Sequence, residues 1–198
     1  EISAREIASI RGFLYALEDP QAVLDILADP AIRIVSLTIT EGGYNIDRTT
    51  GEFDLTSPVI QHELEQPRNP VTVFGYITEA LRIRRETGTQ PFTVMSCDNL
   101  PGNGNVIRQA ILSYAGVVDP SLARWIDAHV SFPNSMVDRI TPVTTEADRE
   151  LVRNTFGIND AWPVVTEPFT QWVLEDTFSS GRPALERVGV QMTADVVP

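Results

Sequence analysis

The sequence predicts an α/β fold in which helices flank a parallel sheet. Two observations support this prediction. Short runs of β-branched and apolar residues alternate with longer stretches whose apolar residues recur at helical spacing, and turn residues separate the two kinds of segment. This order is typical of βαβ units, whose crossovers make the strands parallel. The length of 198 residues fits one ordinary domain or part of a larger one.

The first predicted elements are a strand, a short helix and a second strand. Residues 6–15 have a pattern that favours a strand. Asp19 and Pro20 then supply an N-cap and a first helical residue, and Pro30 ends the helix that they begin. Residues 34–40 are rich in β-branched residues and alternate apolar with hydroxyl side chains, which predicts a strand.

A longer helix and a buried strand come next. Residues 45–69 are polar and contain prolines, so we expect loops there with one short helix. Residues 69–88 open with Asn-Pro, carry an apolar stripe and end on glycine, which predicts a helix. Residues 92–96 are largely apolar and favour a buried strand.

The second half repeats the order of turn, helix and strand. We expect a turn over residues 97–104, a helix with its apolar stripe over 106–114, and a further helix over 119–129. A strand is predicted over 130–132. From about residue 143 the pattern changes. Residues 145–148 suit the start of a helix, and the type of the aromatic, acidic stretch 162–175 stays open.

Composition limits the partners of the protein. The formal net charge of −12 and the pI near 4.5 argue against a nucleic-acid partner and against an anionic membrane. Arg82, Arg84 and Arg85 form the only dense basic run, which favours a solvated helix face over a phosphate site. No apolar run reaches the length of about 20 residues that crosses a bilayer, and we expect a cytoplasmic protein.

The cysteine and histidine residues predict neither a disulfide nor a metal site. Cys97 is the single cysteine, so an intramolecular disulfide and a cysteine-rich metal site are excluded. Cys97 follows a predicted strand and precedes Asp98, which favours a packed residue over a nucleophile. His62 and His129 lie far apart in the sequence and are interpreted as surface or hydrogen-bonded residues.

Three polar clusters follow predicted strands, at residues 40–43, 96–99 and 134–139. If the sheet is parallel, all three are expected at the same rim, where ligands bind in open α/β sheets. In the second cluster the amide of Asn99 can donate to a developing oxyanion. The turn that follows lacks the full dinucleotide glycine fingerprint, so we expect its glycines to supply positive φ and Asn103 to cap the next helix.

The third cluster contains an adjacent acid and base. Asp138 stands between Val137 and Ile140 and is expected to lose water on folding. An internal ion pair with Arg139 and a functional carboxylate are both consistent with these residues.

Four motifs together resemble the polyol-specific long-chain dehydrogenases. They are Thr-Ile-Thr-Glu-Gly-Gly-Tyr over 38–44, Ser-Cys-Asp-Asn-Leu-Pro over 96–101, the Val-Asp-Arg-Ile-Thr-Pro core within 132–142, and Trp-Pro-Val-Val-Thr-Glu-Pro-Phe over 162–169. The resemblance implies a Rossmann-like fold and a metal-independent enzyme that uses NAD or NADP to interconvert a polyol and a ketose, such as D-mannitol and D-fructose.

The resemblance also implies roles for individual residues. Asn99 matches an asparagine that holds the substrate oxygen, and Asp138 matches an acidic residue beside a lysine that acts as general base. Thr40, Glu41, Asn99 and Val137 match positions that contact the cofactor, with Thr40 and Glu41 at its nicotinamide end.

The resemblance further implies that residues 1–198 are part of an N-terminal dinucleotide-binding domain, incomplete at both ends, without the C-terminal helical substrate domain. All 15 basic residues are arginine, so the lysine, like the family's glycine-rich turn, is expected outside this sequence. We expect a monomer or a weak homo-oligomer. A fructuronate or tagaturonate reductase, and a non-catalytic α/β binding or oligomerisation module, remain open alternatives.

Overall fold

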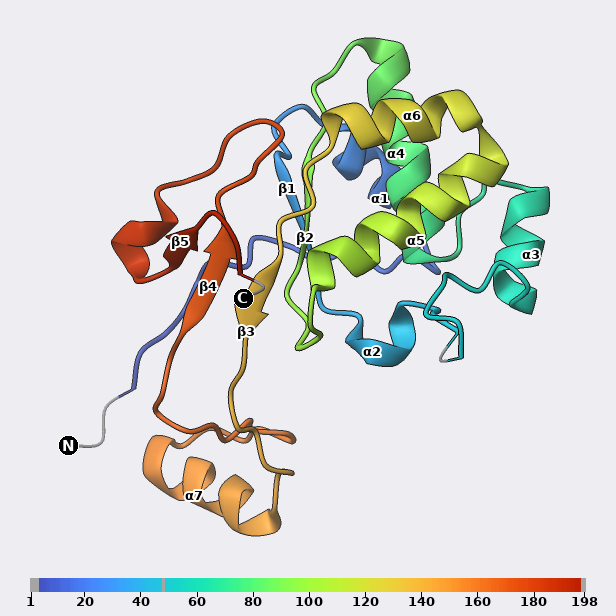
Figure 1. Ribbon diagram of the computed structural model, residues 1–198. Helices are drawn as coiled ribbons and strands as arrows, with labels where there is room; N and C mark the ends of the chain where they lie inside the picture. The colour runs from blue at the N-terminus through green and yellow to red at the C-terminus, as the bar shows by residue number, and fades with distance from the viewer. Residues whose placement is uncertain (1–3, 48, 197–198) are drawn as a thin grey trace. The chain divides into compact units, whose positions relative to one another are not determined.

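The computed structural model describes residues 4–47 and 49–196, and it divides into two compact units (Figure 1). The larger one, here called the sheet unit, comprises Leu14–Val137 and Trp172–Pro198. The smaller one, here called the α7 unit, comprises Glu1–Phe13 and Asp138–Gln171.

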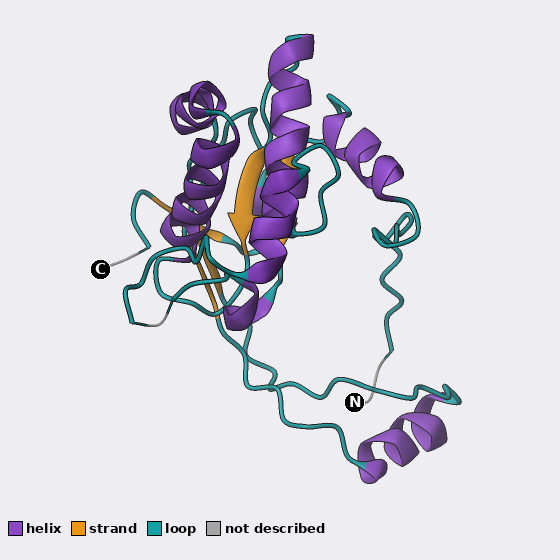
Figure 2. Ribbon diagram, turned by 90° about the vertical axis from the view of Figure 1, so that its right-hand side faces the viewer, coloured by secondary structure: helices purple, strands orange, loops and turns teal. Residues whose placement is uncertain are grey.

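The sheet unit contains the predicted pair of parallel strands. β1 (Ile34–Leu37) pairs with β2 (Thr93–Ser96) in parallel, with Ile34 opposite Thr93 and Leu37 opposite Ser96. The connection between them crosses through α4 (Val73–Thr87), as expected for a βαβ unit. Figure 2 shows helices packed around these strands. The remaining helices of the connection and of the segment after β2 are α2 (Thr40–Gly43), α3 (Pro58–Glu65), α5 (Asn103–Val118) and α6 (Pro120–His129).

Local capping signals place the helix ends where the sequence predicts them. Asp19 accepts a hydrogen bond from Ala22 N at 2.9 Å and begins α1 (Pro20–Ala28). Asp119 does the same for α6 through Ser121 N at 2.8 Å. Gly88 ends α4 in the left-handed conformation, with φ of 70°.

A second sheet departs from the all-parallel prediction. β3 (Ser135–Val137) pairs antiparallel with β4 (Trp172–Glu175), which pairs parallel with β5 (Gln191–Thr193), and a 3-10 turn (Leu185–Val188) precedes β5. The strand predicted over 130–132 was therefore placed too early. That segment gives β2 a main-chain bond from Val94 N to Ser131 O at 3.0 Å, but Pro133 has no N–H with which to extend a ladder.

Of the other strand predictions, one was wrong and one was wrong in part. Residues 6–15 form no strand, and Ile10 and Phe13 are exposed. A segment pairs as a strand only where it finds a partner strand. β1 stops at Leu37 instead of continuing to Thr40, because the following backbone N–H groups bond to a side chain and not to a neighbouring strand.

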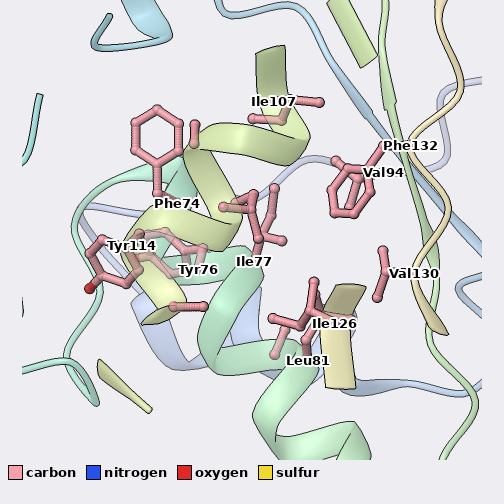
Figure 3. Packing of buried hydrophobic residues seen from close by; sticks show 14 of the residues in the cluster. Phe74, Tyr76, Ile77, Leu81, Val94, Ile107, Tyr114, Ile126, Val130 and Phe132 are labelled. Atoms are coloured by element: carbon pink, nitrogen blue, oxygen red, sulfur yellow. The ribbon is translucent and has the colours of Figure 1, made fainter. Parts of the chain in front are cut away.

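The hydrophobic core of the sheet unit lies between β2 and its helices (Figure 3). Val94 of β2 is fully buried, and side chains of α4, α5 and α6 pack in the same cluster. The labelled members of that cluster are Phe74, Tyr76, Ile77, Leu81, Ile107, Tyr114, Ile126, Val130 and Phe132. Burial of this face fixes the helices against the strands that support the polar rim.

Arg84 corrects the prediction that the basic run is a solvated helix face. Its side chain is 1% exposed and lies with its guanidinium 4.8 Å from the centre of the Phe92 ring. The guanidinium donates to four backbone carbonyls at 2.5–2.8 Å, those of Leu27, Asp29, Ile32 and Gln90. Arg84 thereby ties the loop before β1 to the loop before β2.

The other two arginines of the run pair with carboxylates. Arg82 contacts Glu79, with a shortest distance of 2.6 Å, and Arg85 contacts Asp119 at 2.9 Å. Two of the three arginines of the run are therefore paired with carboxylates within the sheet unit, whereas Arg84 bonds to carbonyl oxygens. The sequence does not reveal this role of Arg84, because its acceptors lie up to 57 positions away.

The α7 unit is organised around α7 (Glu146–Phe156). The helix starts at residues 145–148 as predicted, and a capping box is present there: Thr145 Oγ1 accepts from Asp148 N at 3.3 Å, and Thr145 N donates to Asp148 Oδ2 at 2.7 Å. Arg149 lies 5.3 Å from the centre of the Trp162 ring. Among the described residues of this unit only Pro163 is buried, so the unit has no hydrophobic core of its own. Across residues 4–47 and 49–196, no helix is long and apolar enough to cross a membrane.

Replacing Arg84 with methionine tests the buried arginine. We expect Arg84→Met to lower the free energy of unfolding by at least about 3 kcal/mol, because four carbonyls lose their donor in a site that excludes water. Urea unfolding measures the change. Arg108→Met is the matched control, since Arg108 and Asp127 are both about half exposed, and it should cost less than about 1 kcal/mol. Equal losses in the two variants would contradict the structural role of Arg84.

Candidate active site

Two cavities open at the carboxyl ends of β1 and β2, where the polar clusters were expected. The larger has a volume of about 470 Å³ and the smaller of about 210 Å³, and both have Leu100 in their lining. The larger is lined by Glu41, Gly42, Tyr44, Asn45, Ile46, Gly51, Asp54, Leu100 and Val106. The smaller is lined by Asn99, Leu100, Pro101, Gly102, Asn134, Ser135, Met136, Val137 and Val196.

Asp98 joins the first polar cluster to the second. Its Oδ2 accepts from Ile39 N and its Oδ1 from Thr40 N, both at 2.9 Å. The side chain thereby caps the short helix α2 from the turn after β2. The α2 segment itself supplies no side-chain cap. The rim after β1 and the rim after β2 are held together as one structure.

The backbone of Thr40 is strained where Asp98 holds it. Thr40 has a φ of 64°, in the left-handed region that β-branched residues rarely adopt. Such a conformation costs of the order of 1–3 kcal/mol and persists only where surrounding contacts impose it. The two-pronged contact with Asp98 is such a constraint.

Tyr44 and Ser96 extend the hydrogen-bond chain inward. Tyr44 is fully buried, and its hydroxyl donates to Asp98 Oδ2 at 2.7 Å. Since that hydroxyl has one proton, Ser96 Oγ must be the donor in its 2.5 Å contact with the Tyr44 oxygen. Burial raises the pKa of Tyr44 far above its usual value, so the phenol stays protonated and remains a donor.

Asn103 joins the second cluster to the third. Its side chain is fully buried, and Nδ2 donates to Asp98 O at 3.0 Å and to Ser135 O at 2.9 Å. Its Oδ1 accepts from Gly104 N at 2.8 Å and from Ser135 N at 2.9 Å. The prediction that Asn103 caps α5 was wrong, because Asn103 is the first helical residue and its amide links strands instead.

The two glycines beside Asn103 have different roles. Gly102 precedes α5 with a φ of 63°, as predicted for this turn. Gly104 is required for close approach: a Cβ there would lie 2.4 Å from Phe132 O and 2.6 Å from Pro133 O. The absence of a side chain lets the start of α5 pack directly on the backbone that leads into β3.

Asn134 and Glu175 are site residues that the sequence did not point out together. Asn134 Oδ1 accepts from Asn105 N at 3.1 Å, while Asn134 Nδ2 and N donate to the two carboxylate oxygens of Glu175 at 2.9 and 2.8 Å. The pair links the start of α5 to β4. Asn134 lies within the predicted third cluster, but Glu175 is 41 positions away and its contact has no local signal.

The structure brings two of the four predicted cofactor contacts together in one cavity. Asn99 is exposed and lines the smaller cavity with Val137. Glu41 lines the larger cavity, and Thr40 precedes it at the start of α2.

Asp138 lies in the α7 unit, and there it is exposed. The expectation that Asp138 loses water was wrong, because neighbours in sequence do not bury a side chain that no packed element covers. Arg139 donates to Glu167 O at 3.0 Å and to Thr170 Oγ1 at 3.2 Å.

Cys97 has the character of a packed thiol. Burial, and then the nearby charge of Asp98, raise the pKa of Cys97, which disfavours the nucleophilic thiolate. His129 bonds through Nδ1 to Trp125 O at 2.8 Å and stacks on the Trp125 ring. Within the described ranges, no three His, Cys, Asp or Glu side chains are grouped so that they could hold a metal ion.

Comparison with known proteins identifies similar sequences over nearly the whole chain. A family model described as the mannitol dehydrogenase Rossmann domain matches residues 1–187. The polyol:NADP oxidoreductase of Gluconobacter oxydans is 54% identical over 194 residues, and the mannitol 2-dehydrogenase of Cereibacter sphaeroides is 53% identical over 193. Both alignments cover 98% of this chain and 40% of the relative, so the chain spans less than half the length of these relatives.

Solved structures with the same fold are also similar in sequence. The mannitol 2-dehydrogenase of Pseudomonas fluorescens, in a ternary complex with NAD and D-mannitol, matches with a TM-score of 0.91 and 59% identity, over 96% of this chain and 39% of that chain. A D-sorbitol dehydrogenase in substrate-free form matches with a TM-score of 0.88 and 56% identity, over 91% of this chain and 37% of that chain. The predicted Rossmann-like α/β fold is therefore confirmed.

A pair of glycine substitutions in α5 tests the close approach at the site. We expect Gly104→Ala to lower the free energy of unfolding by at least about 2 kcal/mol, since the new methyl group meets backbone atoms that cannot move independently. Gly116→Ala in the same helix meets no atom within 4 Å and should stabilise by about 0.5–1 kcal/mol. Urea or thermal unfolding reports both changes. A neutral Gly104→Ala would show that α5 does not need this contact.

Proposed function

The chain belongs to the mannitol dehydrogenase family, and from this membership we propose that it is part of an NAD(P)-dependent oxidoreductase that interconverts a sugar polyol and a ketose. Residues 1–198 are proposed to form part of its dinucleotide-binding domain, with a helical substrate domain elsewhere in a longer protein. D-Mannitol and D-fructose are the proposed substrate pair.

The observation that carries this proposal is the smaller cavity at the rim of the sheet. It places the amide of Asn99 and the side chain of Val137 in one lining. Through Asp98, the residue before Asn99, the same rim holds the Thr40-Glu41 turn in place. Parts of the first three motifs that carry the resemblance thus lie at this rim, which supports a shared cofactor and substrate site there.

Asn99 is proposed to bind the reacting oxygen of the substrate. Its amide N–H can donate to the alcohol or carbonyl oxygen and stabilise negative charge as that charge develops. An amide suits this role because it does not titrate, so the donor is present at every pH at which the enzyme works. The exposed position of Asn99 leaves the group accessible to a ligand in the smaller cavity.

The same cavity is suited to the nicotinamide end of the cofactor. Leu100, Pro101, Met136 and Val137 supply apolar walls, and the described lining residues include neutral amides and no carboxylate side chain. These walls fit a flat, uncharged ring with a carboxamide. When bound, the cofactor accepts the hydride from the alcohol carbon. Thr40 and Glu41 are proposed to contact its nicotinamide end from the turn after β1.

Asp138 is proposed to tune a lysine general base located outside this chain. A carboxylate beside a lysine raises the lysine pKa by favouring its charged form, and burial lowers it, so the two together can adjust the base. The chain has no lysine of its own, so the base belongs to another segment of the longer protein.

The lining of the cavities supports a neutral substrate over a sugar acid. None of the described residues that line these two cavities is an arginine, the side chain best suited to a substrate carboxylate. A fructuronate or tagaturonate reductase is accordingly the weaker alternative. One relative named for NADP and a solved relative holding NAD leave both cofactors within the proposal.

Substitution of Asn99 tests the proposed oxyanion donor. In the full-length protein, Asn99→Ala should lower kcat for D-mannitol oxidation by about 100- to 1000-fold, because one oxyanion donor is worth about 3 kcal/mol of barrier. Formation of reduced cofactor, followed by absorbance, measures the rate. Asn69→Ala is the matched control: Asn69 is exposed, bonds only locally to Gln66 at 3.3 Å, and its loss should leave kcat unchanged. Similar rates in the two variants would reject the role of Asn99.

The isolated 198-residue chain should show no polyol oxidation. We expect this because the proposed general base is a lysine and the chain contains none. The measurement is cofactor reduction with D-mannitol, compared at equal molar concentration with the full-length protein. Turnover by the isolated chain at the full-length rate would show that the base lies within these residues.

A further inference from the structure

We propose that Asp98 is a positioning residue that holds Thr40 in its left-handed conformation and thereby keeps the Thr40-Glu41 turn in place beside Asn99. This inference rests on the proposed function, because it concerns the geometry of that site. Asp98 does not itself touch substrate or cofactor in this proposal. It acts through the backbone of the turn.

Asp98 constrains the same backbone segment in which Thr40 is strained. Thr40 is one of two non-glycine residues with positive φ in the described ranges, and it is β-branched. Both oxygens of the Asp98 carboxylate are used on this turn, one for Ile39 N and one for Thr40 N, each at 2.9 Å. A single carboxylate that bridges consecutive N–H groups fixes the orientation of the peptide between them.

The Asp98 carboxylate is itself held in position by a hydrogen bond from a buried side chain. Tyr44 Oη donates to Asp98 Oδ2 at 2.7 Å and accepts a hydrogen bond from Ser96 Oγ, and both Tyr44 and Ser96 are buried. Ser96 is the last residue of β2. A chain of side-chain hydrogen bonds therefore connects the turn after β1 to the end of β2.

Thr40 and Glu41 themselves gain little support from packing, although the neighbouring Ile39 and Tyr44 pack against the core. The helix α2 has four residues and no side-chain cap from its own segment, and Thr40 and Glu41 are exposed. Burial therefore does not hold these two residues in position. When the Asp98 contact is weakened, Thr40 is free to return to negative φ, which turns Glu41 away from the rim.

A double-substitution experiment in the full-length protein tests this proposal. Asp98→Asn is isosteric, but its NH₂ group faces an N–H donor where the carboxylate offered an acceptor. This variant is compared in two backgrounds that both lack the Thr40 hydroxyl. Thr40→Ala keeps a Cβ and hence the strain, whereas Thr40→Gly adopts positive φ freely. We expect Asp98→Asn to lower kcat/KM for D-mannitol by at least about tenfold in the Thr40→Ala background, the loss typical of a charge-assisted hydrogen bond.

In the Thr40→Gly background the loss should be less than about threefold, since glycine does not need the carboxylate to reach this conformation. Thermal unfolding confirms that each variant folds. Equal losses of kcat/KM in both backgrounds would overturn the proposal, because a purely structural or catalytic role of Asp98 does not depend on the residue at position 40.

Hydrogen exchange over residues 38–44, followed by mass spectrometry, tests without an activity assay whether Asp98 holds the Thr40-Glu41 turn. The amides of Ile39 and Thr40 should exchange at least about tenfold faster in Asp98→Asn than in the unsubstituted protein, because each loses a charge-assisted acceptor. Unchanged exchange overturns the proposal. If the unsubstituted protein oxidises no polyol, the proposed function fails, and the exchange measurement still decides whether Asp98 holds the turn.

Discussion

The buried amide of Asn103 is the interaction on which the arrangement of the site depends. It bonds to the backbone at the end of β2, to the first residue of β3 and to its own helix, with no exposed surface left for water. Each partner lost in such a place costs about 1–3 kcal/mol. The end of β2, the start of α5 and the start of β3 therefore form a rigid wall, and Gly104 lets the wall close without a gap.

The turn after β1 forms a second wall, which is held in a different way. The turn at Thr40 and Glu41 is exposed and is fixed by the Asp98 carboxylate, which Tyr44 supports from the core. Buried hydrogen bonds of Asn103 and the close approach at Gly104 stabilise the first wall, whereas hydrogen bonds to an exposed turn stabilise the second. The buried wall is therefore preformed, whereas the position of the exposed turn depends on a single side chain.

Local signals in the sequence were sufficient for the helices, while long-range contacts were not visible in it. Asp-Pro caps, the glycine at 88 and the capping box at Thr145 act within a few residues, and the structure has them where they were expected. The buried role of Arg84, the bond between Asn134 and Glu175 and the antiparallel pairing of β3 depend on residues that meet only after folding. Asp138 illustrates the same limit, because apolar neighbours in sequence did not bury it.

The half-buried thiol of Cys97 has a practical consequence for spectroscopy. Its pKa is raised by burial and then by the charge of Asp98, so little of the reactive thiolate exists at neutral pH, and alkylating reagents reach it slowly. It is also the only cysteine of the chain. A second cysteine introduced at an exposed position can therefore carry a fluorescent or paramagnetic probe while the native thiol stays unmodified. The movements of the exposed rim become observable in a protein whose own sulfur does not interfere.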